Sequence, residues 1–380
     1  MRLLFYMKKE ISVLFVTTNL NYNGAKKYIV EVANELACRG YKVGLLFDGG
    51  PLAKNLNENV KKYHIKVRGL GFDPISRVRT IFKAAFIARN EGFNIIHGEA
   101  SSSLLSHKLL STFSKSRVVE TIHHIWTKEA ERQKAAKRLP GRADVLIAIS
   151  QDFLTVLKKA GLISKKIVVI QNGIDTKKFG KTKQKEIKSL KADLGVGEKD
   201  PVLVWVSRVC GEKTPESFVN WFPYILADFP NARFVMVGDN GSGDRTYLNS
   251  LIEKIKSLGL NKHIICVGGQ TDVEKYLALG DIFTITRLAR DLSVMEAMAS
   301  GLPVIVSRTG MLKPELVLHG KTGFLFDKFA WQQWADQVKY LLSNPHTAKK
   351  FGELGKKRVN TLFSIERYVN DLEKVYEHLI

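Results

Sequence analysis

The sequence has few cysteines, no long apolar run and a shortage of acidic residues. Its 380 residues include only Cys38, Cys210 and Cys266, which lie far apart and form no CxxC pair. This pattern excludes a disulfide framework, favours a reducing compartment and predicts three small core residues. No run reaches the roughly 18 apolar residues of a membrane-spanning helix, and no HExxH set supports a metal site.

The amino terminus, MRLLFYMKKEISVLFVTTNL, has the apolar content of a signal peptide, but charges divide it. Lys8, Lys9 and Glu10 interrupt the apolar segment that a signal peptide keeps continuous. We therefore interpret Ile11 to Thr17 as a first buried strand and expect the protein to be cytoplasmic.

The charge is strongly positive, because 59 basic residues face 37 acidic ones and give a formal net charge of +22. Such an excess favours nucleic acid, a phosphate-bearing substrate or an acidic membrane face, although scattered solvated lysines produce it too. No nucleic-acid recognition module is visible. Residues 77–89, with Arg77, Arg79 and Lys83, mix basic and apolar residues at helical spacing, and Lys128–Arg142 is a polar helix with a basic end. Either stretch could hold the protein peripherally on the inner face of an anionic membrane.

Continuous apolar runs alternate with segments of helical periodicity, which indicates parallel sheets covered on both faces. The runs are SVLFVTT, KVGLLF, NIIHG, RVVETIHH, DVLIAIS and KIVVI, then PVLVWVS, RFVMVGD, HIICVGG, IFTIT and LPVIVS. We predict an α/β protein with two doubly wound, Rossmann-like parallel-sheet domains that face each other across a cleft, with ligand at the carboxyl ends of the strands. The predicted boundaries are 1–175, a polar linker at 176–200, 201–360, and a helix at 361–380 that packs back toward the first domain.

The segment DLSVMEAMASGLPVIVSRTG, residues 291–310, carries the most specific pattern for a ligand site. Glu296 lies in the first turns of a predicted helix, which leads through Gly301 and Pro303 into an apolar strand. Amide groups at a helix start attract phosphate, and a carboxylate one turn further accepts hydrogen bonds from sugar hydroxyls.

Other loops after predicted strands carry weaker signals. Gly24 opens the predicted helix Lys26–Cys38, where it lets amides approach a ligand or simply makes the turn. Arg208 and Lys213 could grip a diphosphate, although a solvated loop fits the same spacing. The glycines of residues 238–243 lack the GxGxxG spacing, so we reject a nicotinamide site and expect a loop that lines the cleft.

His97 and His123 each end a predicted strand, and His124 follows the second. A histidine at such a position either donates to a substrate or closes a local hydrogen bond.

In their order, these segments resemble the retaining glycosyltransferases of the two-domain GT-B type, specifically glycosyltransferase family 4 (glycosyl transferases group 1). The most specific likenesses are KIVVIQNGIDTKKF, similar to KIxVIPNGVDxxxF, and EAMASGLPVIVS, similar to EAMAxGxPVIAS. FNIIHGE, TIHH, ADVLIAIS, SRVCGEK, DIFTIT and TGFLF are similar to the family segments DIIH, TVHD, ADxVIAVS, GRLxxEK, DxFVxPS and TGxLV.

The resemblance implies that a sugar moves, with retained configuration, from a nucleoside diphosphate sugar to a glycan, lipid-linked or glycolipid acceptor. It implies an acceptor-side first domain, a nucleotide-sugar-binding second domain, and neither metal nor cofactor. The implied catalytic residues are His123 near the donor sugar, Arg208 and Lys213 on the diphosphate, and Glu296 on the ribose. The implied donor-binding residues are Gly24, Arg208, Lys213, Gly268, Asp291, Leu292 and Glu296.

The sequence departs from the family pattern at four positions, three of which are Asn23, Ser207 and Thr214 in place of glycine. The fourth concerns a pair of family glutamates with seven residues between them, of which Glu296 matches the second and Leu288 stands in place of the first. Asp291 could supply the carboxylate and Arg287 or Arg290 a phosphate contact, or the sugar end of the site could be altered or lost; His97 completes this tentative set. A degenerate protein that binds nucleotide or glycan without turnover, and a sugar-nucleotide epimerase on the same fold, are the alternatives. The donor base cannot be inferred, because the family reads it through backbone near residues 268–271.

Overall fold

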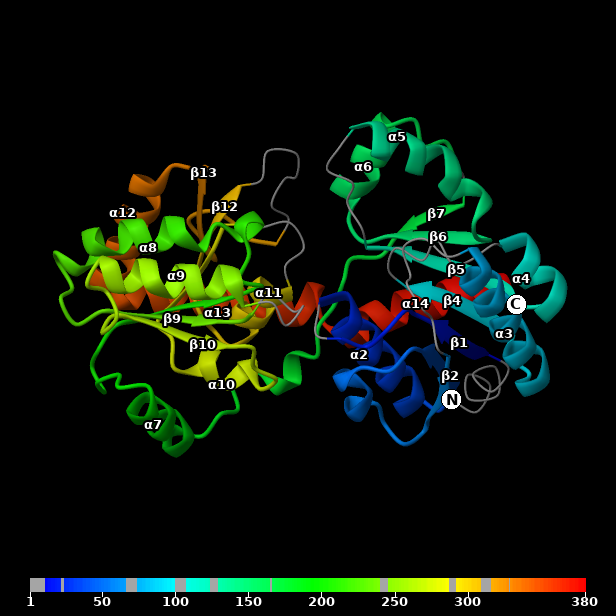
Figure 1. The fold of residues 1–380 in the computed structure, drawn as a ribbon, viewed down its shortest axis with the longest axis horizontal. Helices are drawn as coiled ribbons and strands as arrows, with labels where there is room; N and C mark the ends of the chain where they lie inside the picture. The colour runs from blue at the N-terminus through cyan, green and yellow to red at the C-terminus, as the bar shows by residue number, and fades with distance from the viewer. Residues whose placement is uncertain are drawn as a thin grey trace. The chain divides into compact units, whose positions relative to one another are not determined.

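The computed structural model describes residues 11–21, 24–65, 74–99, 107–123, 129–164, 166–239, 245–286, 292–308, 316–327 and 329–380. The chain forms two compact units (Figure 1). The first consists of Met1–Gly173 together with Ile365–Ile380, and the second of Ile174–Ser364.

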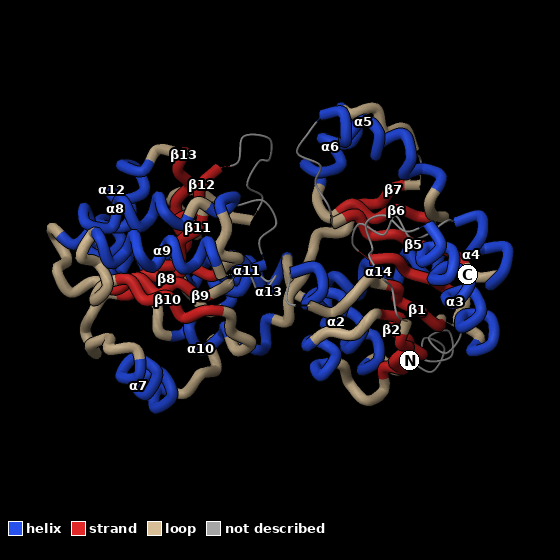
Figure 2. The backbone as a smooth tube through the Cα atoms, in the orientation of Figure 1, coloured by secondary structure: helices blue, strands red, loops and turns tan. Residues whose placement is uncertain are grey.

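The first unit is built on a seven-stranded parallel sheet with the strand order β3-β2-β1-β4-β5-β6-β7 (Figure 2). The order reverses between β1 and β4, so the loops that follow these strands diverge there. The strands are β1 (Ser12–Val16), β2 (Lys42–Phe47), β3 (Val60–His64), β4 (Ile95–Glu99), β5 (Arg117–Ile122), β6 (Val145–Ala148) and β7 (Ile167–Val169). The helices are α2 (Gly24–Cys38), α3 (Pro74–Glu91), α4 (His107–Ser114), α5 (Glu129–Arg138), α6 (Gln151–Lys159) and α14 (Ile365–Leu379), with the short turns η1 (Pro51–Asn55) and η2 (Leu139–Gly141).

Helices cover both faces of this sheet, as the continuous apolar strands require. Along β1, Leu14 and Val16 share a buried cluster with Ile81 of α3. Phe15, which points to the opposite face, stacks on His97 at 5.2 Å between ring centroids. His97 in turn contacts Tyr376 of α14, so the carboxyl-terminal helix belongs to the second covering layer.

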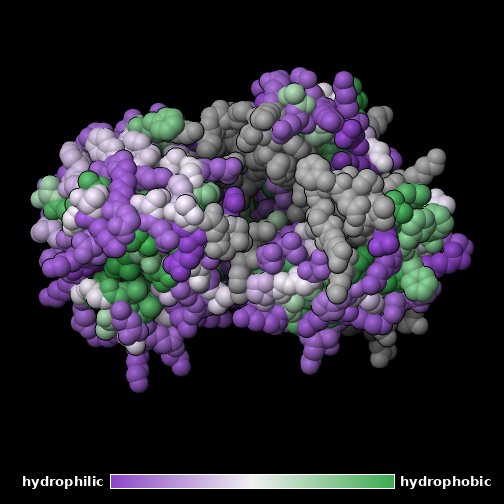
Figure 3. Space-filling view, viewed as in Figure 1, coloured by the Kyte–Doolittle hydropathy of each residue, from purple (hydrophilic) through white to green (hydrophobic). Residues whose placement is uncertain are grey.

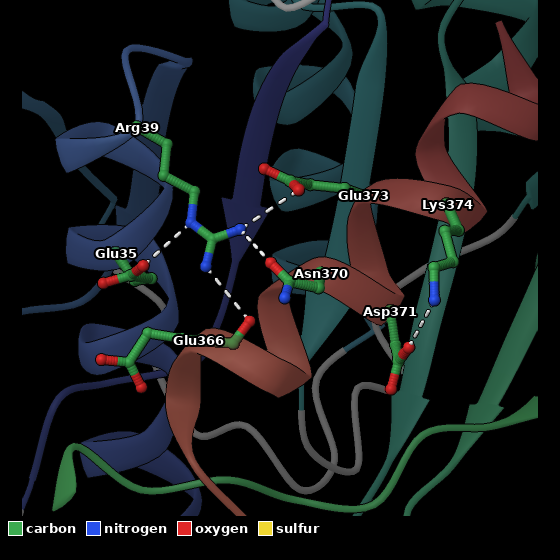
Figure 4. A network of polar contacts seen from close by, with 7 residues as sticks. All are labelled: Glu35, Arg39, Glu366, Asn370, Asp371, Glu373 and Lys374. Atoms are coloured by element: carbon green, nitrogen blue, oxygen red, sulfur yellow. Dashed lines mark hydrogen bonds and ion pairs between the residues drawn. The ribbon is translucent and has the colours of Figure 1, made fainter. Parts of the chain in front are cut away.

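A polar network fastens α14 to α2 (Figure 4). Arg39 Nε donates to Glu35 of its own helix at 2.8 Å. Its terminal nitrogens reach Asn370 Oδ1 at 2.6 Å, the Glu366 carbonyl at 3.1 Å and Glu373 Oε2 at 3.1 Å. One guanidinium therefore binds three residues of α14, and the last helix of the chain is held on the first unit.

The second unit is built on a six-stranded parallel sheet with the order β10-β9-β8-β11-β12-β13. Its order reverses between β8 and β11. The strands are β8 (Val202–Val206), β9 (Arg233–Val237), β10 (Ile264–Gly268), β11 (Ile282–Ile285), β12 (Val304–Arg308) and β13 (Gly323–Asp327). The helices are α7 (Gln184–Asp193), α8 (Pro215–Leu226), α9 (Thr246–Ser257), α10 (Val273–Ala278), α11 (Leu292–Ala299), α12 (Trp331–Ser343) and α13 (Pro345–Leu362), with the turns η3 (Thr176–Lys178) and η4 (Gly211–Lys213).

The predicted fold class is confirmed, and each of the eleven apolar runs contains a strand. The runs did not include β3 and β13, which are the outer strands on one side of each sheet. β3 reads VKKYH and exposes its lysines, so it lacks the apolar signal of a central strand. Within the described ranges, no helix is long and apolar enough to cross a membrane.

Candidate functional site

The loop after β8 places two cations at the point where the strand order of the second sheet reverses. It runs from Ser207 through the turn η4 to Thr214, whose φ of 44° lies in the left-handed region, and Pro215 then starts α8. The turn carries Lys213 inward, and only 6% of this lysine is exposed. Arg208 is different, because 53% of its side chain is exposed and it lies 3.7 Å from the Glu212 carboxylate.

Thr286, the residue after β11, joins the two sides of this switch point. Its hydroxyl donates to the Lys213 carbonyl at 2.8 Å. Its own carbonyl accepts a hydrogen bond from the Ser307 hydroxyl of β12. All three residues are buried. The carboxyl ends of β8, β11 and β12 are therefore held together by side-chain bonds to main-chain carbonyls, which fixes the position of the lysine loop.

Glu296 is carried by α11, the helix that follows β11. Val294, Met295 and Ala297 bury this helix in the core. Only 5% of Glu296 is exposed. The helix ends before Gly301, which adopts a φ of 87° and returns the chain to β12. The predicted order of helix, glycine and apolar strand is thus observed. The buried carboxylate of Glu296 therefore follows β11, and the buried Lys213 follows β8.

Gly238 begins the segment that we predict to line the cleft, although the sequence pattern did not single out this glycine. It follows β9 with a φ of 142°, and a Cβ atom there would lie 1.8 Å from the Ser207 carbonyl oxygen. Its amide donates to the Gly268 carbonyl at 2.8 Å, and the neighbouring Asp239 carbonyl accepts from the amide of Val209 at 2.9 Å. Only glycine permits this close approach of the loops after β8, β9 and β10. A glycine directly after a buried strand was the available signal.

The carboxyl edge of the first sheet carries the other candidates. Gly24 opens α2, and Lys26, which sequence reasoning did not select, is buried and donates to the Thr17 hydroxyl at 2.5 Å. His123 follows β5, is half-buried and packs against Tyr28 at 5.3 Å between ring centroids.

Of the two roles that its strand-end position allows, donating to a substrate or closing a local hydrogen bond, His97 has the second, structural one. It is completely buried, and its ring nitrogens bond to the Tyr376 hydroxyl at 2.6 Å and the Thr121 hydroxyl at 2.8 Å. Because both nitrogens have partners in the core, His97 joins β4, β5 and α14 and contributes to stability.

The remaining predicted site positions divide between described and undescribed residues. Leu292 is half-buried at the start of α11, and Gly268 ends β10 with a φ of 81°. Across the described ranges, no three His, Cys, Asp or Glu side chains gather as a metal ion would require. Three predicted or tentative positions lie outside the described residues: Arg287, Arg290 and Asp291. Leu288, at the position of the missing family glutamate, and His124 lie outside them too.

Two doubly wound parallel sheets, with a buried lysine and a buried carboxylate that follow the two strands at the switch point of the second, fit the two-domain GT-B glycosyltransferase type that the sequence resembles. Comparison with known families agrees with this class. Residues 186–358 match the family model of glycosyl transferases group 1, and residues 22–178 match that of glycosyltransferase family 4. The chain therefore belongs to this family of glycosyltransferases.

Relatives resemble the chain over most of its length. N-acetyl-alpha-D-glucosaminyl L-malate synthase of Bacillus anthracis is 24% identical over 91% of this chain and 91% of its own length. UDP-Gal:alpha-D-GlcNAc-diphosphoundecaprenol alpha-1,3-galactosyltransferase of Escherichia coli is 23% identical over 68% of this chain and 69% of its own. Among solved structures, Anabaena Alr3699/HepE in complex with UDP and glucose has a TM-score of 0.80 at 20% identity and covers 97% of this chain and 100% of its own. The last similarity shows the same fold.

Proposed function

We propose that this glycosyltransferase moves a sugar from a nucleoside diphosphate sugar to its acceptor with retention of configuration and without a bound metal or cofactor. The observation that supports the donor class is the pair Lys213 and Glu296, two buried charged side chains on either side of the switch point. Burying charge is unfavourable unless the charge is compensated. In the proposal, a bound diphosphate and ribose add to that compensation during each catalytic cycle.

The proposed mechanism assigns each charge to one part of the donor. Lys213 and the more exposed Arg208 stabilise the negative charge that grows on the departing diphosphate. Glu296 accepts hydrogen bonds from the ribose hydroxyls. His123 contacts the donor sugar, and Gly24 lets the loop before α2 approach it, as the family resemblance implies. The acceptor attacks from the face that the phosphate leaves, and the phosphate oxygen takes the acceptor proton, so no protein nucleophile is needed.

For the acceptor we propose a lipid-linked glycan or a glycolipid precursor, reached from the cytoplasmic side of a membrane. The relative from Escherichia coli is named for a diphosphoundecaprenol acceptor, which is lipid-linked. The formal net charge of +22 favours an anionic surface. Exposed Arg79 and Lys83 on α3 and the basic end of α5 supply charges for such a contact.

A thermal-shift screen against uridine, guanosine and adenosine diphosphate sugars tests the donor class and identifies the base. The stabilising donor is then used in an assay of nucleoside diphosphate release. We expect Glu296→Ala to abolish release, whereas Glu212→Ala, which removes an exposed carboxylate from the lysine loop, should leave most of it. If no donor in the panel stabilises or turns over, the proposed function is wrong.

A second candidate is a binding protein without turnover, which Leu288 in place of the family glutamate favours. Asp291→Asn separates the two. In an active enzyme that uses Asp291 for the donor sugar, this change keeps binding of the free nucleoside diphosphate and lowers the rate of release. A wild-type protein that binds the donor tightly and never releases product would support the second candidate.

A further inference from the structure

Two neighbouring helices of the first unit expose large apolar side chains side by side. α3 and α4 pack against each other, and Phe82 of α3 meets Phe113 of α4 at 5.0 Å between ring centroids. Figure 3 shows apolar surface over this part of the molecule, at the right of the view. We call the exposed apolar residues of the two helices, which are 36–66% exposed, the α3–α4 patch: Val78, Phe82, Phe86, Leu109 and Phe113.

α3 exposes its two largest apolar side chains and buries smaller ones. The residues of the helix in the core are Ile81, Ala84, Ala85, Ile87 and Ala88, whereas Phe82 and Phe86 are exposed, the latter by 66%. Val78, Phe82 and Phe86 follow one another at a spacing of four, so they form one row along the helix. A contiguous apolar patch of this kind marks an interaction surface, whereas a single exposed apolar residue does not.

Charge decides which partner fits this patch. Arg79, Lys83 and Arg89 are exposed on α3 beside the apolar row, and Lys83 donates to the His64 carbonyl at 2.6 Å. None of the exposed side chains described on α3 and α4 is acidic, and Glu91 at the end of α3 is half-buried and pairs with Lys61 at 2.8 Å. An apolar row flanked by cations alone is typical of a helix that lies in the interface of an anionic membrane.

We infer that the α3–α4 patch is the membrane-docking surface of this glycosyltransferase, with the phenylalanines inserted below the headgroups and the cations on anionic lipids. The inference rests on the proposed function, since a lipid-linked acceptor has to be reached at the membrane. It adds that apolar insertion through this one surface, and not diffuse attraction of a basic protein, holds the chain there.

Sedimentation of the full chain with vesicles tests the inference. We expect wild type to bind vesicles of phosphatidylcholine with phosphatidylglycerol more tightly than phosphatidylcholine alone. Phe82→Gln and Phe86→Gln should each lower the partition coefficient about tenfold, which partial burial of one phenylalanine ring predicts. Arg79→Gln should lower it about fivefold, the factor for one cation near an anionic surface, and added salt should remove that difference. Glutamine is a good helix former, so these variants should keep the helix.

Ile163→Gln is the matched control, because Ile163 is an apolar residue of the same unit, 88% exposed and outside the patch. It should bind vesicles as wild type does. The inference fails if wild type binds neither kind of vesicle, or if Phe82→Gln and Phe86→Gln bind as the control does. It also fails if wild type is a dimer that these changes dissociate without any binding to vesicles, because the patch would then join two copies of the chain.

Donor turnover in the absence of lipid separates this inference from the proposed function. If the patch variants release nucleoside diphosphate from the donor as wild type does but lose the vesicles, both proposals stand. If the patch variants lose vesicle binding but wild type turns over no donor, the docking surface stands and the proposed function is overturned. If wild type turns the donor over but the patch variants bind vesicles as wild type does, the proposed function stands and the docking surface is overturned.

Discussion

Thr286→Val removes the hydroxyl that holds the lysine loop to the strand end across the switch point. In the structure this hydroxyl donates to the Lys213 carbonyl at 2.8 Å, and both residues are buried. Valine keeps the branched shape of threonine but supplies no donor, so the change withdraws one hydrogen bond from a buried carbonyl without creating a large cavity.

The size of the effect follows from that geometry. Withdrawing a partner from a buried polar group costs about 1–3 kcal/mol. In a unit of this size, each kcal/mol lowers the melting temperature by about 2–4 °C, so we expect a fall of about 2–12 °C. The lysine loop also loses its fixed position, and we expect nucleoside diphosphate to bind about tenfold more weakly, which corresponds to about 1.4 kcal/mol.

Thr284→Val is the matched control. Thr284 is buried on β11, two residues before Thr286; it donates to the Ile305 carbonyl at 2.9 Å and accepts from Trp334 Nε1 at 2.7 Å. It should therefore lose at least as much stability as Thr286→Val. Because it holds no part of the lysine loop, its affinity for nucleoside diphosphate should stay that of wild type. Calorimetric melting and titration of both variants make the measurement. Equal affinities in the two variants would refute the positioning role of Thr286, whatever their stabilities.

Three further predictions concern the fold around the site. Gly238→Ala should unfold the second unit or lower its stability by more than about 3 kcal/mol, because the new Cβ atom would overlap a main-chain carbonyl. Gly268→Ala places its Cβ atom in open space and should cost only about 1–2 kcal/mol, for the positive φ of this residue. Thermal melts of the two variants compare these costs. Arg39→Met should destabilise the first unit by about 1–3 kcal/mol in urea denaturation, because it removes the contacts to α14, and an unchanged midpoint would contradict this. The prediction of three core cysteines is wrong for Cys38, which is exposed. Burial raises the pKa of the Cys266 thiol to about 11, so at pH 8 iodoacetamide should alkylate it far more slowly than Cys38, as peptide mapping would show.

The sequence allowed the central strands to be predicted because a strand covered on both faces is apolar throughout. Leu14 and Phe15 show this directly, since they are neighbours on β1 and pack into opposite layers. The outer strand β3 has solvent on part of its surface and carries two adjacent exposed lysines, so the same rule does not detect it. Its assignment needs the pairing of Val60 with Val43 on β2, which is a tertiary fact.

The candidate site was predictable where one local segment determines it. Lys213 could be selected because its loop directly follows an apolar run, and Glu296 because its helix leads into one. Thr286 could not be selected, because its role depends on the carbonyl group of a residue distant in the chain. Gly238 offered a local signal, a glycine directly after a buried strand, but the carbonyl that excludes a Cβ atom there also belongs to a distant residue. His97 could be selected from its place at a strand end, but its structural role could not be inferred, because only its contact with Tyr376, far along the chain, identifies it as a core residue.

Each sheet places a buried lysine shortly after the first strand beside its switch point, and the two lysines are held in different ways. In the first unit the ammonium group of Lys26 donates to the Thr17 hydroxyl. In the second unit a threonine binds the main chain of Lys213 instead, through its carbonyl. The Thr17 contact engages the side chain of Lys26, whereas the Thr286 contact fixes the main chain of Lys213 and so the loop that carries it. The proposal that Lys213 binds the donor diphosphate rests on the place of this loop, since Lys213 lies buried beside the switch point of the second sheet, as Glu296 does.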